Sequence, residues 1–208
     1  KSLLKNAELL NEMKNPDEWG FSFKDFKADM SKAIDRSRSV SKKLTQGIEF
    51  LVKKNKIDLV LGSAKLLSSS SVNVGEDILL ATNVIIATGA RPRSLPGLEI
   101  DKNLIITSRE ALELRKKPKS IAIIGASAIG CEFAYYFNAY DVEVTLFEIM
   151  DRIVPKGDAD ISKELQRQFS KQGIVSNTSV KITNVVKNKN SVTLDFEKSG
   201  EISTKQFD

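Results

Sequence analysis

The hydrophobic residues in the first quarter of the chain recur three or four positions apart. This spacing predicts helices over residues 2–13 and roughly 23–54, because residues three and four apart share one face of a helix. Residues 15–20, which include Pro16 and Gly20, are expected to connect the two helices. After residue 55 the spacing shortens to two, which predicts short strands at 57–61, 64–67, 72–74 and 83–88.

The second half of the chain alternates between strand and helix patterns. It follows the turn-rich segment 90–97, where a domain boundary is expected, and Ser108 is expected to cap a helix over residues 109–114. The elements expected beyond it are a strand at 121–124, a turn at 125–130, a helix at 131–140, a strand at 142–147, a helix at 160–172, and strands at 174–175, 180–186 and 192–196. Such an alternation predicts an α/β fold with a parallel sheet.

Composition and charge exclude several classes of function. The net charge is +5, but the lysines are interspersed with acids in short clusters, so a solvated surface is expected and a nucleic-acid partner is not. No apolar run reaches the roughly 18–20 residues of a membrane span, so no membrane association is expected. A single cysteine excludes a redox-active dithiol within these residues. It also fits a reducing compartment. No metal site is expected.

The segment that follows the strand at 121–124 carries the strongest chemical signal. It reads Gly125, Ala126, Ser127, Ala128, Ile129 and Gly130, and a helix follows it. In a Rossmann unit such a turn places a pyrophosphate on the free amides at the start of the helix. The usual middle glycine is replaced here by Ser127, whose small hydroxyl side chain is compatible with phosphate binding.

An acidic residue, Glu148, ends the next strand, about 18 residues beyond Gly130. A carboxylate at this position can accept hydrogen bonds from both ribose hydroxyls of an adenosine and would repel a 2′-phosphate, which favours NAD over NADP. The alternative interpretation is a doubly wound domain with a vestigial turn and a solvent-facing glutamate.

Several segments, taken in order, resemble the pyridine nucleotide-disulfide oxidoreductases, and within that family the dihydrolipoamide dehydrogenase branch. They are TNVIIATGARPRSLPG, ITSREALEL, KPKSIAIIGASAIGCEFA, VTLFE and DRIVP, and the resemblance covers essentially the whole chain. It implies that residues 105–208 form a Rossmann-like NAD-binding domain, truncated before its last strand. It also implies that residues 1–104 form the C-terminal part of a split FAD-binding domain.

The same resemblance implies a set of cofactor-binding residues. For NAD they are Gly125 to Gly130 on the pyrophosphate, Glu148 on the ribose, Val180 near the adenine, and Glu132 near the place where nicotinamide meets flavin. For FAD they are Lys1 beside the flavin, Ala64 near the adenine, and Thr88, Gly89 and Ala90 in a second contact. Cys131 matches no redox cysteine, and we expect it to be a buried, inert thiol.

The activity implied by the resemblance is oxidation of dihydrolipoamide, with hydride passing through FAD to NAD. KSLLKNAELL resembles the segment just after the family's redox-active cysteine pair, and the chain has no histidine to act as its base. An internal fragment without catalytic residues of its own is therefore expected. The implied partners are the lipoyl domain of a 2-oxo acid dehydrogenase complex and a second copy, bound through an interface domain outside this chain. The implied location is the bacterial cytoplasm, with the mitochondrial matrix or a plastid as alternatives.

Three other functions remain open from the sequence. One is a sister disulfide oxidoreductase such as a mercuric or glutathione reductase, although Glu148 disfavours the NADP that glutathione reductases usually prefer. Another is a flavoprotein NADH oxidoreductase without the cysteine pair. The third is a non-enzymatic NAD-binding module.

Overall fold

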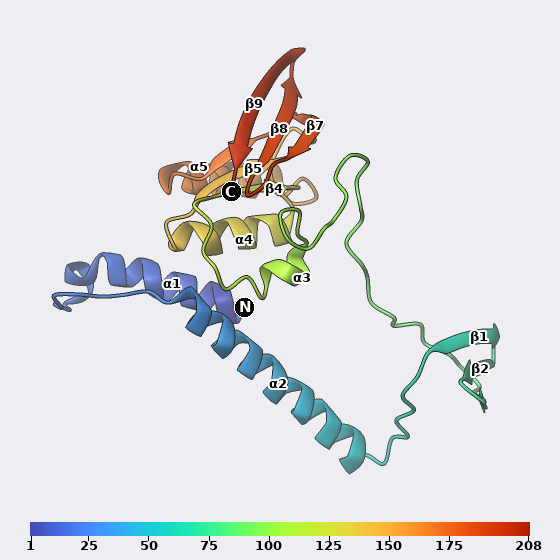
Figure 1. The fold of residues 1–208 in the computed structure, drawn as a ribbon. Coiled ribbons are helices and arrows are strands. Elements are labelled where there is room, and N and C mark those ends of the chain that lie inside the picture. Colours follow the sequence, from blue (N-terminus) through green and yellow to red (C-terminus); the bar gives the residue numbers. More distant parts are fainter. The chain divides into compact units, whose positions relative to one another are not determined.

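The computed structural model describes residues 1–208, and its packing divides the chain into two units (Figure 1). The first unit combines Lys1–Arg38 with Arg93–Asp208, and the second is Ser39–Pro92. The long helix α2 (Met30–Lys54) belongs to both, because its first turns lie in one unit and the rest in the other. None of the helices combines the length and the apolar composition that crossing a membrane requires.

A three-stranded parallel sheet lies at the centre of the first unit. Its strands are β4 (Ser120–Ile124), β5 (Glu143–Phe147) and β6 (Val175–Asn177), in the order β4-β5-β6. The helices α4 (Ala128–Ala139) and α5 (Ala159–Lys171) connect them. Four of the five residues of β5 are buried, because this strand has a neighbour on each side. The α/β fold with a Rossmann-like alternation is confirmed.

Helix α1 (Ser2–Lys14) packs on α4 and extends the core of the first unit. The hydroxyl of Tyr140, just after α4, donates to the Asn6 side chain at 2.6 Å. The largest side chains of this core are aromatic residues of α4, Tyr136 and Phe137, and neither is exposed. The helix predicted at residues 2–13 is thus confirmed, and its apolar face contacts the second half of the chain. The buried residues of that face are Leu3, Ala7 and Leu10.

A second sheet follows β6 and is antiparallel throughout. It consists of β7 (Lys181–Lys187), β8 (Val192–Lys198) and β9 (Glu201–Phe207), in the order β7-β8-β9. Phe147 of β5 contacts this sheet, with its ring centroid 6.1 Å from that of Phe207. The sequence did not predict β9, because its residues are mostly polar and exposed, and its pairing with β8 is a property of the fold.

Two predicted helix starts are corrected by capping residues. Helix α2 begins at Met30 and not near residue 23, because the side chain of Asp29 accepts a hydrogen bond from the Lys32 amide at 3.1 Å. Helix α3 (Ser108–Ala111) is capped by Thr107 and not by Ser108. Thr107 forms a capping box with Glu110. The connection between α1 and α2 contains the short 3-10 helix η1 (Pro16–Trp19).

The second unit contains the end of α2 and an antiparallel meander. Its strands are β1 (Ala64–Ser68), β2 (Ser71–Val74) and β3 (Asp77–Leu80), in the order β1-β2-β3. No residue between Ser39 and Pro92 is buried. The strands predicted at 57–61 and 83–88 are wrong. These apolar segments have no hydrogen-bonded neighbour strand, and an apolar run becomes a strand only when its backbone finds a partner.

Candidate dinucleotide site

The turn between β4 and α4 begins with a backbone conformation that only glycine adopts easily. Gly125 has φ +100°, and its amide donates to the carbonyl of Phe147 at 2.8 Å, which continues the pairing of β4 with β5. The turn therefore starts at the carboxyl end of the parallel sheet. In open α/β sheets, ligands bind at this end.

The other two positions of the turn differ in what they require. A Cβ atom on Gly130 would overlap the carbonyl oxygen of Gly125, so the glycine lets α4 approach β4 closely. Ser127 has φ −74° and ψ −175°, an extended conformation that any residue adopts. The serine at the middle position is therefore compatible with this turn.

The amides at the start of α4 are free to bind a ligand. Ser127 is the N-cap residue, but its side chain makes no capping hydrogen bond. No protein group accepts a hydrogen bond from the amides of residues 127–130. Residues 127–129 are exposed, and the helix dipole adds partial positive charge at this end. Free amides and positive potential together favour the binding of an anion.

Glu148 follows β5 directly and faces the turn. Its carboxylate accepts hydrogen bonds from the amide of Ala126 at 2.8 Å and from the amide of Met150 at 3.0 Å. Only 8% of the residue is exposed, so the alternative of a solvent-facing glutamate is wrong. Two amides occupy about half of the roughly four lone-pair positions of a carboxylate, which leaves acceptors for a ligand.

Val180 is joined to Glu148 by a backbone hydrogen bond. Its amide donates to the Glu148 carbonyl at 3.0 Å, and the Glu148 amide donates to the Asn177 carbonyl at 2.8 Å. The structure thus brings together three of the features predicted for an NAD site: the glycine turn, the acidic residue and Val180. Glu132 lies on α4, beyond the turn, and is exposed. Its proposed position near nicotinamide stays a prediction.

The residues predicted for FAD belong to different units. Lys1 caps α1 in the first unit, whereas Ala64 starts β1 in the second and pairs with Val74. Residues 88–90 lie in an irregular segment of the second unit, where Gly89 has φ +77°. All of these residues are exposed, and no hydrogen bond joins β1 to residues 88–90. Their contact with FAD stays a prediction.

The sequence did not indicate the backbone contacts that hold the turn. The amide of Met150 donates to Glu148, and the amide of Val154 donates to the carbonyl of Ala126 at 2.7 Å. Backbone amides carry no side-chain signature, so residue types could not reveal them. Only their position in the sequence could have indicated these contacts, because both residues come shortly after a strand that ends beside the turn.

Cys131 is buried next to the turn. Its thiol contacts the Ala126 carbonyl oxygen at 3.4 Å. Burial, followed by the nearby negative charges of Glu148 and Glu132, raises the pKa of the Cys131 thiol to about 11. The expectation of a buried thiol is confirmed, and a high pKa keeps it in the unreactive protonated form.

Cys131 is expected to react with iodoacetamide at pH 8 at least about tenfold more slowly than free cysteine. The reason is that both burial and the raised pKa deplete the accessible thiolate. Labelling followed by mass spectrometry, with and without urea, measures the rate. Equal rates in the folded and unfolded chain would contradict the buried position.

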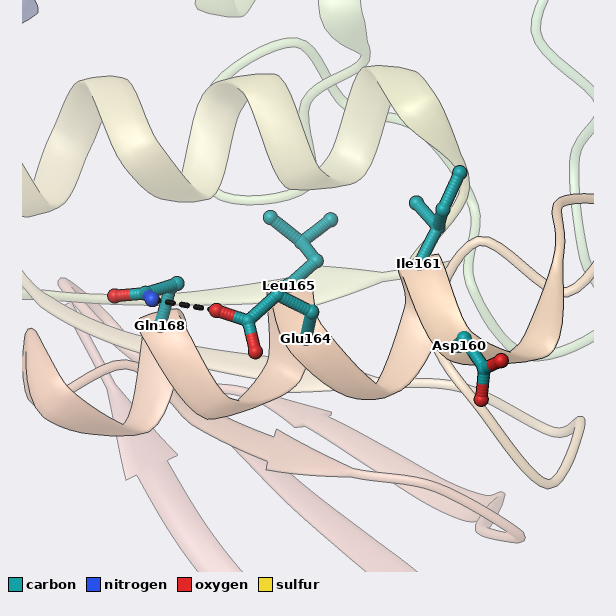
Figure 2. A pocket seen from close by; sticks show the side chains of 5 residues that line it. All are labelled: Asp160, Ile161, Glu164, Leu165 and Gln168. Carbon is teal, nitrogen blue, oxygen red and sulfur yellow. Dashed lines mark hydrogen bonds between the residues drawn. The ribbon is translucent and has the colours of Figure 1, made fainter.

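Two hollows lie in the first unit away from the turn. Five residues of α5 line a hollow of about 470 Å³, in which Gln168 donates a hydrogen bond to Glu164 at 2.6 Å (Figure 2). The other, of about 540 Å³, lies beside the C-terminal end of α4 and includes Tyr140 and Asp141. Neither contains a predicted cofactor-binding residue, so the candidate site is the exposed turn and not an enclosed cavity.

Comparison with known proteins agrees with this geometry. The family model described as pyridine nucleotide-disulphide oxidoreductase matches residues 3–207. The chain belongs to this family. The family resemblance seen in the sequence motifs is thereby confirmed over almost the entire chain.

Similar members of the pyridine nucleotide-disulphide oxidoreductase family include dihydrolipoyl dehydrogenases. That of Chlorobaculum parvum is 40% identical over 206 residues, which cover 97% of this chain and 44% of the relative. That of Bacillus subtilis is 36% identical over 219 residues, covering 98% of this chain and 46% of the relative. The chain therefore spans about half the length of the curated relatives that it matches.

Two solved structures show the same fold. The crystal structure of LpdA from Mycobacterium tuberculosis has a TM-score of 0.85 at 21% identity and matches 100% of this chain with 46% of its own. The flavoprotein disulfide reductase RclA from Escherichia coli has a TM-score of 0.77 at 21% identity, over 100% of this chain and 44% of its own. At this identity the match concerns the fold alone.

Proposed function

We propose that this chain supplies the NAD site, and part of the FAD site, of a flavin-dependent dihydrolipoamide dehydrogenase. The observation that carries the proposal is the position of the Glu148 carboxylate, 2.8 Å from the Ala126 amide in a turn whose next four amides are free. The identity of 36–40% to dihydrolipoyl dehydrogenases supports the choice of this enzyme within the family.

The residues of the turn fit the adenosine half of NAD. The amides of residues 127–130 would bind the pyrophosphate, with Gly125 and Gly130 allowing the backbone to take this shape. Glu148 would accept hydrogen bonds from the ribose hydroxyls, and Val180 would approach the adenine through its backbone. Glu132, on the same helix, would lie toward the nicotinamide.

The residues proposed for FAD are Lys1, Ala64, Thr88, Gly89 and Ala90. All five residues are exposed, which is compatible with contact to a large cofactor. On this proposal, residues 1–104 are the C-terminal part of a split FAD-binding domain, and residues 105–208 are the NAD-binding domain. When bound, the two cofactors supply the hydride-transfer chemistry, and the residues of this chain hold them in position.

The partners and the location follow from the proposed enzyme. The whole protein would accept electrons from the lipoyl domain of a 2-oxo acid dehydrogenase complex and would act as a homodimer. Its location would be the bacterial cytoplasm, as for a soluble enzyme in a reducing compartment. The similarity to bacterial dihydrolipoyl dehydrogenases supports these assignments.

The chain is expected to bind NADH at least about tenfold more tightly than NADPH, because the Glu148 carboxylate would face the 2′-phosphate. Isothermal titration of the 208-residue chain with each nucleotide measures both affinities. Equal affinities, or tighter NADPH binding, would contradict the ribose assignment of Glu148.

The substrate is tested separately with the whole enzyme. Dihydrolipoamide-dependent reduction of NAD⁺ is expected. If the chain binds NADH but the whole enzyme does not oxidise dihydrolipoamide, the enzyme is a sister oxidoreductase on the same scaffold. If the chain does not bind NADH, the proposed NAD site, and with it the proposed function, is wrong.

A further inference from the structure

The loop from β5 to α5 contains a residue in an unfavourable backbone conformation. Val154 has φ +46°, in the left-handed region, although its side chain is β-branched and Pro155 follows it. Both properties disfavour this conformation, since a branched Cβ crowds the backbone and a following proline restricts the preceding residue to extended geometry. Such a residue persists only where its surroundings hold it.

Three hydrogen bonds hold Val154 in place. Its amide donates to the Ala126 carbonyl at 2.7 Å, and its own carbonyl accepts from the Gly157 amide at 2.8 Å. The same carbonyl accepts from the hydroxyl of Ser162 at 3.3 Å. Ser162 is a buried residue of α5, so the loop is tied to that helix on one side and to the dinucleotide turn on the other.

The bond to Ala126 fixes the direction of the next amide in the turn. All peptide bonds of the chain are trans, so the N–H of Ser127 points opposite to the carbonyl of Ala126. Because that carbonyl points toward Val154, the Ser127 amide points away from the loop, and it has no protein acceptor. On the other side of Ala126, its own amide is held by Glu148. The Cys131 thiol also donates to the Ala126 carbonyl, at 3.4 Å, but the amide of Val154 is the closer donor at 2.7 Å, so the loop makes the shorter of the two contacts that orient the Ser127 amide.

We infer that Val154 is a positioning residue for the pyrophosphate of NAD, acting through the Ala126–Ser127 peptide. The inference rests on the proposed NAD site and deepens it. Val154 does not touch the nucleotide. Its strained conformation brings its amide to the Ala126 carbonyl, and this contact aims the Ser127 amide at the ligand. The strain is offset by the bonds to Gly157 and Ser162.

The test replaces one backbone N–H group by an oxygen atom. Val154 is replaced by its α-hydroxy analogue, 2-hydroxy-3-methylbutanoic acid, so that an ester oxygen stands where the amide donated. The matched control is the same change at Ile153, whose amide makes no hydrogen bond with the protein. We expect the Val154 ester to weaken NADH binding about fivefold to tenfold, and the Ile153 ester to leave it within about twofold.

A rescue variant separates positioning from packing. Val154→Gly keeps the amide and adopts a left-handed φ without strain, so NADH affinity is expected to stay within about twofold of the original. If Val154→Gly loses affinity while the Val154 ester does not, the side chain matters and the amide does not, which overturns the inference.

Ordinary mutagenesis provides a second test if the ester chain does not fold. Ser162→Ala removes the donor to the Val154 carbonyl, whereas Ser170→Ala changes an exposed serine of the same helix. We expect about a threefold loss of NADH affinity in the first variant only. Equal affinities of the two variants overturn the inference. Absence of NADH binding in the unmodified chain overturns the proposed function as well, so the two failures are distinguishable.

Discussion

Gly130→Ala is expected to destabilise the chain by about 3 kcal/mol and to abolish measurable NADH binding. The added methyl group would overlap the carbonyl oxygen of Gly125 and approach the carbonyl carbon at 3.1 Å. Both atoms belong to the backbone of the turn, so no side-chain rotation can relieve the overlap. Helix α4 would have to move away from β4, and its first amides would move with it. Urea unfolding followed by far-ultraviolet circular dichroism measures the loss of stability.

The chain contains a matched control for this substitution. Gly47 lies within α2, and a Cβ atom added there would meet no other atom within 4 Å. Gly47→Ala is expected to stabilise α2 by up to about 1 kcal/mol, because alanine has the higher helix propensity. If Gly130→Ala and Gly47→Ala had similar effects, the close packing of α4 on β4 would be wrong.

Glu148→Ala is expected to weaken NADH binding about thirtyfold, since it removes the charged acceptor for the ribose and releases the turn. Ala126 is fully buried, so its amide would lose its partner without gaining water. An unsatisfied buried donor costs about 1–3 kcal/mol, so the unfolding free energy is expected to fall as well. Calorimetric titration and urea unfolding measure the two effects separately.

The control for Glu148 lies at the other end of the same strand. Glu143 is the first residue of β5. Its side chain is 61% exposed and forms an ion pair with Lys205 at 2.8 Å. Glu143→Gln is expected to change neither NADH affinity nor stability measurably, because exposed ion pairs contribute little. Unchanged NADH affinity in a folded Glu148→Ala variant would remove Glu148 from the binding site.

The elements predicted correctly are those with strong local signals. The apolar run before Gly125 and the glycine turn after it predicted β4 and a helix after the turn, although α4 begins at Ala128, three residues before the predicted start. The position of Glu148 after a second apolar strand predicted its place beside the turn, because the carboxyl ends of parallel strands meet at one edge. In each case the residues that determine the structure lie close together in sequence.

The features missed depend on backbone pairing, which residue composition alone does not reveal. Residues 57–61 and 83–88 have strand-like composition but no strand to pair with. The reverse holds for β9, which is polar but pairs along its whole length with β8. The conformation of Val154 is a further case, since neither valine nor a following proline favours a left-handed φ. Only the bonds to the turn and to α5 account for it.

The discontinuous first unit has a consequence for the order of folding during synthesis. Helix α1 leaves the ribosome before α4, yet the surface that covers Leu3, Ala7 and Leu10 includes α4, which is translated only after the entire second unit. Domains usually fold as they emerge. The contact between α1 and α4 can therefore form only late, and closing it joins segments separated by a long stretch of chain. Such non-local contacts slow folding far more than they lower stability, because the entropy of closing a loop grows only with the logarithm of its length.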